Sequence, residues 1–270
     1  MTNIHFDEQE KLSACIREVA VEELMPRFSN VKRQVKRDGS YVTEADLAVQ
    51  RRMSDYLQRN WPGIPFHGEE MSSVEQAALL DSDSPIWCLD PLDGTTNFVS
   101  DIPYFCISMA LIARGEVQLG IVYDPNRDEC YSARLGEGAR LNGEAIEPQR
   151  HRTSLSGATA LVDFKRLPSL LSTRLVNETP YASQRSFGSV ALDLCWIAAG
   201  RCDLYLHGRS KVWDYGAGLL ILHESGGNST TLDGERVFSR RLEPRSIVAA
   251  AEKRVFDEWC DWLEVRPQAR

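Results

Sequence analysis

The chain has 270 residues, of which 43% are hydrophobic and 26% are charged, and its formal net charge at pH 7 is -8. This composition is typical of a globular protein that forms an apolar core and has little reason to remain disordered. The negative charge argues against general binding to a nucleic-acid backbone. Because the length also allows two fused domains, we expect an N-terminal lobe at 1–147 and a C-terminal lobe at 148–270, packed as one compact unit.

The first ten residues are acidic and polar, which is unlike a secretory signal. No apolar stretch approaches the roughly 20 residues that are needed to cross a bilayer. The seven cysteines are odd in number and include no CxxC pair, so neither a disulfide framework nor a zinc knuckle is expected. These features predict reduced thiols and a cytoplasmic location without membrane contact.

In the first half, apolar residues at helical spacing predict two helices, and short apolar runs predict strands. The helices are expected over 7–25 and from Thr43 to the residue before Trp61, the strands at 64–66 and 86–89, a hairpin around 114–116, and further short strands to about 146. Thr43 and Asp46 have the spacing of a capping box. Both early strands lead directly into acidic residues, so two strand ends should deliver carboxylates.

The second half alternates between strands and helices. Strands are expected at 159–163, 203–206 and 247–250, and helices at 189–199, at 214–224 and at the end of the chain. This order predicts an α/β lobe that follows an α+β lobe. No internal repeat or flexible linker separates the two.

The most informative stretch is WCLDPLDGTTNF, which starts at Trp87. Asp90 is expected to end a strand, the proline after it to turn the chain, and Asp93 to follow directly before Gly-Thr-Thr with its backbone amides. Two carboxylates at this spacing repel each other, and a hard divalent cation with oxygen ligands offsets that repulsion. Magnesium fits best, and zinc is disfavoured because the stretch offers only Cys88 as a soft ligand. Taken alone, Asp-Pro and Asp-Gly also occur in ordinary turns.

Taken together with other parts of the chain, this stretch resembles the inositol monophosphatase family, which belongs to the lithium-sensitive, magnesium-dependent sugar-phosphate phosphatases. The resemblance spans nearly the whole chain. It rests on Lys36 with VTEAD at 42–46, GEE at 68–70, DPLDGTTNF at 90–98 and WDYGAG at 213–218. The resemblance implies a layered αβαβα sandwich of the inositol monophosphatase and fructose-1,6-bisphosphatase type, commonly a homodimer, with its metal site between the lobes.

Matching positions imply the metal ligands Glu69, Asp90, Asp93, Asp214 and the carbonyl of Leu92, with Asp90 bridging two ions. The resemblance implies that two or three Mg²⁺ ions bind to each subunit, that Mn²⁺ can substitute, and that Li⁺ and Ca²⁺ inhibit.

The same resemblance implies that the amides of Gly94 and Thr95 hold the phosphate and that Thr95 and Asp46 are the catalytic pair that orients and deprotonates the attacking water. Direct attack by water is expected, because no G-x-S-x-G elbow or P-loop supports a protein nucleophile.

Some of these residues also have simpler structural explanations. Asp214 precedes a predicted helix and is compatible with an N-cap, and Asp46 is compatible with the third position of a capping box. Of the two adjacent glutamates, Glu69 is assigned as the ligand from the family's use of the first glutamate after glycine. Glu70 is then an outer residue or a solvated one.

The substrate pocket departs from the family pattern. A glutamate that contacts the cyclitol in inositol-specific members is replaced here by His207, which can donate a hydrogen bond where glutamate only accepts. Alternatively, His207 is an exposed residue at a strand end. The amides of Gly188, Ser189 and Val190 are expected to line the same pocket, unless Ser189 is only a helix cap.

The expected substrate is inositol monophosphate or a similar small sugar or polyol phosphate, and the DGTTNF ending favours this over the nucleotide-bisphosphate branch. The alternatives are histidinol phosphate, fructose-1,6-bisphosphate or 3′(2′),5′-bisphosphate nucleotides, or a role as a regulatory partner of the transcription machinery. Lys165 and Arg166 are candidates for binding a second anionic group, or are solvated surface.

Overall fold

The computed structural model describes residues 6–29, 33–35, 41–82, 84–147 and 154–268. Lys36, part of the resemblance, lies outside them. The helices are α1 (Phe6–Val19), α2 (Glu44–Asn60), α3 (Ser73–Leu80), α4 (Thr95–Phe98), α5 (Ser169–Asn177), α6 (Val190–Ala198), α7 (Val212–Glu224) and α8 (Lys253–Leu263), with the shorter helical turns η1 (Ala20–Leu24), η2 (Leu155–Gly157) and η3 (Phe164–Arg166).

The strands form a larger sheet, a smaller sheet and a separate hairpin. The larger sheet contains, in spatial order, β3 (Phe66–Gly68), β4 (Ile86–Asp93), β5 (Cys106–Ala113), β6 (Glu116–Asp124), β7 (Glu129–Arg134), β8 (Ala139–Leu141) and β9 (Glu144–Ala145). The smaller sheet contains β11 (Ser183–Arg185), β10 (Thr159–Val162), β12 (Leu204–Ser210), β14 (Arg245–Ala250) and β13 (Asn228–Thr230). The hairpin pairs β1 (Arg33–Val35) with β2 (Tyr41–Thr43).

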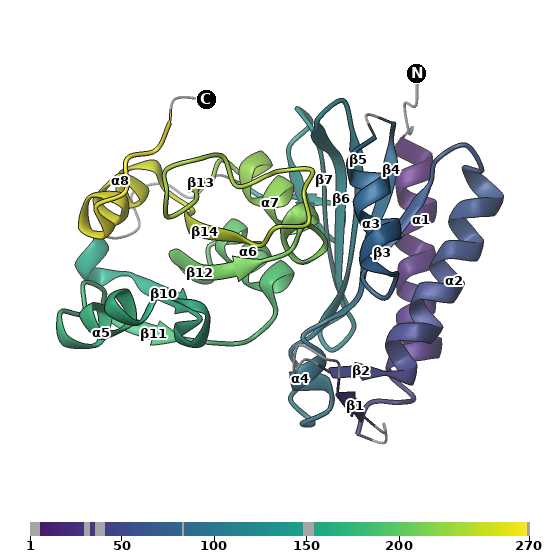
Figure 1. Ribbon diagram of the computed structural model, residues 1–270, viewed down its shortest axis with the longest axis horizontal. Coiled ribbons are helices and arrows are strands. Elements are labelled where there is room, and N and C mark those ends of the chain that lie inside the picture. Colours follow the sequence, from purple (N-terminus) through teal and green to yellow (C-terminus); the bar gives the residue numbers. More distant parts are fainter. Residues whose placement is uncertain (1–5, 30–32, 36–40, 83, 148–153, 269–270) are drawn as a thin grey trace.

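Sheets and helices alternate across the molecule (Figure 1). α1 and α2 cover one face of the larger sheet, α6 and α7 lie between the two sheets, and α5 and α8 cover the outer face of the smaller sheet. This arrangement confirms the expected αβαβα sandwich. Among the described residues, none of the helices is both long enough and apolar enough to cross a membrane.

The alternation of side chains along β4 determines which face of the larger sheet carries Asp90. In β4, Trp87 and Leu89 pack toward α1 and α2, whereas Ile86 and Cys88 pack toward α6 and α7. Because successive side chains of a strand point to opposite faces, the next residue on the inner face is Asp90. The apolar run that predicted this strand therefore also sets the direction of the first carboxylate.

Helix α7 packs on β5, β6 and β7 of the larger sheet, although it comes from the second half of the sequence. Gly120 of β6 makes this close packing possible, since a Cβ at that position would lie 2.8 Å from the carbonyl oxygen of Ala217. One apolar cluster joins residues of both halves, including Ile112, Leu192 and Ile247.

Several predicted boundaries are wrong. The strand expected at 64–66 lies at Phe66–Gly68, and β4 continues through the Asp-Pro pair to Asp93, so the proline does not turn the chain. Helix α7 begins at Val212, before Asp214. The sequence had predicted no element where α3, α5 and β11 lie.

Candidate active site

The parallel pairing of β3 with β4 brings Glu69, which directly follows β3, beside Asp90 within β4. β3 and β4 run parallel with Gly68 opposite Leu89, and the backbone N–H of Glu69 donates to the Leu89 carbonyl at 3.1 Å. Since the carboxyl ends of parallel neighbours lie at the same edge of a sheet, each strand delivers its acidic residue to one place.

Beyond Asp93, where β4 ends, the chain enters the short helix α4. Gly94, with φ 99°, begins the short helix α4, and a Cβ there would lie 2.9 Å from the Tyr104 carbonyl oxygen, so glycine is required. The hydroxyl of Thr95 donates to the Leu92 carbonyl at 3.0 Å. α4 lies beside β2, which leads into α2 (Figure 1).

Asp46 is the third residue of α2 and is fully buried. Its Oδ2 accepts from the backbone N–H and the hydroxyl of Thr43, at 2.8 and 2.5 Å, which confirms the capping box. Its Oδ1 is also buried but finds no hydrogen-bond partner among the described residues. One oxygen therefore closes the helix, and the other remains able to accept a proton.

Asp214 lies in the first turn of α7. The alternative explanation of Asp214 as the N-cap of α7 is wrong, because Lys211 occupies that position. The backbone N–H of Lys211 donates to Oδ2 of Asp214 at 2.8 Å. The hydroxyl of Ser108 in β5 donates to the Trp213 carbonyl at 3.3 Å. This contact fixes the start of α7 against the larger sheet, close to Asp90.

Asp93 is bound to the start of α6. Oδ2 of Asp93 accepts from the Ser189 hydroxyl and from the backbone N–H of Ala191, both at 2.7 Å. Ser189 is also the N-cap of α6 and accepts from the backbone N–H of Leu192 at 3.4 Å. Gly188, with φ 87°, and Val190 flank this contact, so the segment predicted to line the substrate pocket lies against Asp93.

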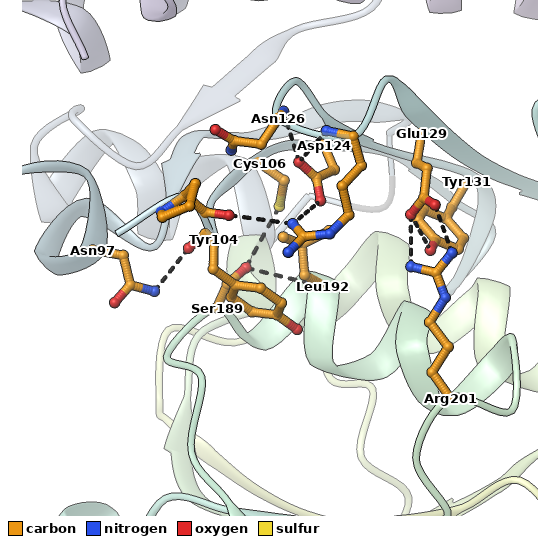
Figure 2. A network of polar contacts seen from close by, with 12 residues as sticks. Asn97, Tyr104, Cys106, Asp124, Asn126, Glu129, Tyr131, Ser189, Leu192 and Arg201 are labelled. Atoms are coloured by element: carbon orange, nitrogen blue, oxygen red, sulfur yellow. Dashed lines mark hydrogen bonds and ion pairs between the residues drawn. The ribbon is translucent and has the colours of Figure 1, made fainter. Parts of the chain in front are cut away.

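A polar network joins this helix start to the larger sheet (Figure 2). Asn97 donates to the carbonyls of Tyr104 and Phe187, at 2.7 and 2.6 Å, and so bridges the two halves. At the other end of α6, Arg201 forms an ion pair with Glu129. The bridging role of Asn97 could not be predicted from the sequence, because Phe187 is 90 residues away along the chain.

The acidic residues of the site affect one another electrostatically. Burial raises the pKa of Asp90 well above its usual range, and the charges of Glu69, Asp93 and Asp214 raise it further. The pKa of Asp214 is raised by burial and then by Asp93 and Glu69. Burial raises the pKa of Asp93 to about 6 despite its hydrogen bonds to α6. The predicted carboxylates are therefore neighbours.

Asp46 belongs to the same electrostatic group. Burial raises its pKa to about 7, the hydrogen bond from Thr43 opposes this, and the charges of Glu69 and Glu70 add to it. A carboxyl group with this pKa is suited to exchange a proton near neutral pH.

His207 is buried in β12, so the alternative of an exposed strand end is wrong. Its Nδ1 accepts from the backbone N–H of Arg209 at 3.2 Å and from the Ser210 hydroxyl at 2.6 Å. The ring proton is therefore on Nε2, which lies 3.4 Å from Oδ2 of Asp163.

Asp163 and the two basic residues after it lie beside this histidine. Burial alone would raise the pKa of Asp163, but His207, Lys165 and Arg166 together lower it below its usual value. Lys165 and Arg166 are exposed in η3.

The donor chemistry of the acidic group fits a hard divalent cation, because the group consists of carboxylates that repel one another. As they stand, no three Asp, Glu, His or Cys side chains in the described part of the chain could hold a metal ion. Backbone N–H groups bind an oxygen of Asp90, Asp93 and Asp214 instead; the Leu92 N–H, for example, lies 3.0 Å from Oδ1 of Asp90. The predicted ligands are neighbours but do not form a closed coordination shell.

Comparison with known proteins agrees with this fold. The Inositol monophosphatase family matches residues 3–263. Nus factor SuhB of Pasteurella multocida is 35% identical over 235 residues, 84% of either chain, and inositol-1-monophosphatase of Bacillus subtilis is 34% identical over 226 residues, 81% of this chain and 83% of that one. The structure of Thermotoga maritima IMPase has a TM-score of 0.80 at 28% identity, over 96% of this chain and 97% of that chain.

The layered fold, the grouped carboxylates and these relatives define a phosphoric monoester hydrolase. The chain belongs to the inositol monophosphatase family.

Proposed function

We propose that this phosphatase depends on magnesium and hydrolyses inositol monophosphate or a similar small sugar or polyol phosphate by direct attack of water. The observation that supports this best is the group of buried, mutually repelling carboxylates of Asp90, Asp93 and Asp214 beside the glycine-capped start of α4. The relative in Bacillus subtilis is an inositol-1-monophosphatase, which favours a cyclitol substrate.

In this proposal Glu69, Asp90, Asp93, Asp214 and the Leu92 carbonyl hold the expected two or three Mg²⁺ ions. Bound Mg²⁺ would lower the pKa of a water molecule and neutralise charge on the phosphate oxygens. Mn²⁺ would substitute, and Li⁺ and Ca²⁺ would inhibit.

The residues of the chain would bind the phosphate and accept the proton. Asp46 accepts the proton of the attacking water through Oδ1, the buried oxygen without a partner. Thr95 orients the same water, and the amides of Gly94 and Thr95 bind phosphate oxygens at the start of α4.

The substrate alcohol would contact the second half of the chain. His207 would donate from Nε2 to a substrate hydroxyl, in exchange with Asp163. The segment Gly188, Ser189 and Val190 would line the same pocket beside Asp93. This arrangement would favour substrates in which the alcohol part is an uncharged polyol, because its hydroxyl groups can form hydrogen bonds with these residues.

Phosphate release across inositol phosphates, histidinol phosphate, fructose bisphosphate and adenosine bisphosphate, with and without Mg²⁺, tests the proposal. Asp93→Asn keeps the side-chain shape and should lower kcat by orders of magnitude. Asp101→Asn, which removes the same charge from an exposed position, should leave kcat unchanged. Near-normal turnover in Asp93→Asn, or wild-type turnover that persists in EDTA, would refute the proposed chemistry.

The relative named Nus factor SuhB favours a second candidate function, as a regulatory partner of the transcription machinery. Direct binding to purified transcription factors tests it, and Asp93→Asn should bind as the wild type does. The cytoplasmic location and the homodimer stay predictions. Light scattering would show a homodimer as a mass near twice the chain's 30.4 kDa.

A further inference from the structure

Residues 239–242, here called the strap, connect the second half of the chain to the end of α3. Arg240 of the strap donates to the backbone carbonyls of Leu79, Leu80, Ser82 and Ser84. The distances to Leu79, Leu80 and Ser84 are 3.3, 3.2 and 3.1 Å. The last carbonyls of a helix have no partner within it, so one guanidinium group closes the C-terminal end of α3.

Helix α3 in turn holds the backbone at Glu69. Gln76 of α3 is buried, and its Nε2 donates to the carbonyls of Gly68 and Glu69, at 2.9 and 3.0 Å. Ser72 and Glu75 form a capping box at the start of the same helix. A shift of α3 would therefore move the end of β3, from which the Glu69 side chain emerges.

The strap also contacts the start of α7. Nζ of Lys211 donates to the Leu242 carbonyl at 2.5 Å, and the hydroxyl of Tyr215 donates to the Ser239 carbonyl at 3.4 Å. Lys211 and Tyr215 lie on either side of Asp214 in the sequence, and the N–H of Lys211 binds the Asp214 carboxylate directly.

We propose that the strap sets the separation between Glu69 and Asp214, and that Arg240 is a positioning residue for metal binding. Glu69 and Asp214 are the two predicted side-chain ligands outside the 90–93 run, so β4 alone does not fix their separation. The strap contacts the supports of both. Arg240 itself contacts backbone carbonyls, and its planar, forked group suits several such acceptors at once, unlike the single ammonium of lysine.

This inference rests on the proposed function, and Mg²⁺ affinity tests it. Calorimetric titration of the protein with Mg²⁺, without substrate, should show about 10-fold or greater weakening in Arg240→Ala and Arg240→Lys, the range expected when a support of a metal ligand is lost. Saturating Mg²⁺ should restore kcat to within a few-fold of wild type. Arg241→Ala removes the exposed neighbour of Arg240 in the strap and should bind Mg²⁺ as the wild type does.

Gln76→Leu provides a second, independent perturbation, because it removes the contacts to Gly68 and Glu69 and leaves the strap intact. It should weaken Mg²⁺ binding in the same way. If Arg240→Ala does not fold, the Mg²⁺ affinities of Arg240→Lys and Gln76→Leu still test the inference. Wild-type Mg²⁺ affinity in the folded Arg240 variants, or equal weakening in Arg241→Ala, overturns the inference while the proposed function stands. A wild-type protein that hydrolyses phosphate esters without Mg²⁺ overturns the proposed function itself.

Discussion

The hydroxyl of Ser189 donates to Oδ2 of Asp93 at 2.7 Å, although the two residues are 96 positions apart in the sequence. The N–H of Ala191 shares this oxygen, so Asp93 accepts at the start of α6, where the helix dipole favours a negative charge. The two halves of the chain therefore meet within the acidic group itself.

Ser189→Ala should lower the free energy of unfolding by about 1.5–3 kcal/mol, the usual contribution of a buried hydrogen bond to a charged group. Urea denaturation at neutral pH in EDTA measures it. Ser186→Ala, at an exposed position three residues earlier, is the matched control. A Ser189→Ala stability within about 0.5 kcal/mol of wild type would contradict the structural role of this contact.

The metal-free protein should lose stability as the pH rises from about 4 to about 7. Burial raises the pKa of Asp46 from 3.8 to about 7, so between these values the folded protein keeps a proton that the unfolded chain has released. Asp46 therefore stabilises the fold at acidic pH, and this contribution disappears as the pH approaches about 7. Tm measured from pH 5 to pH 8 in EDTA should fall less steeply in Asp46→Asn. Asp55→Asn, on the exposed side of α2, should keep the wild-type slope; an unchanged slope in Asp46→Asn would show that the carboxyl group is ionised throughout.

Gly120→Ala should destabilise the protein by about 1–3 kcal/mol, because the added methyl group meets the backbone of α7 at 2.8 Å and neither partner is a flexible side chain. Chemical denaturation measures the loss. Gly63→Ala adds the same methyl group where no atom lies within 4 Å, and should cost much less. Equal stabilities of the two variants would show that β6 and α7 adjust without strain.

Local sequence patterns predicted several of the elements that carry the candidate site, whereas the roles of its residues were implied by the family resemblance. The short apolar run at 86–89 predicted the first part of β4, which leads into Asp90. The spacing of Thr43 and Asp46 identified the capping box at the start of α2. The grouping of Glu69 with Asp90 follows from two short strands that each end in acidic residues.

Other features depend on pairing that sequence spacing does not show. β4 continues past Pro91 because the pairing with β5 shifts between Asp90 and Asp93, and a strand tolerates a proline at such an irregularity. The partner of Ser189 is too distant to be recognised from the sequence. Helix α3, by contrast, could have been found, because Ser72 and Glu75 have capping-box spacing.

The position of helix α7 also affects whether the first half of the chain can fold without the second. It closes the inner face of the larger sheet, and at its far end Glu224 accepts from the N–H groups of Gly136 and Gly138, at 2.9 and 2.8 Å. A polypeptide stopping at residue 147 would leave apolar residues such as Ile86 and Ile112 exposed to water. We therefore expect that a polypeptide of residues 1–147 does not reach the native state alone and needs the fragment that supplies α7.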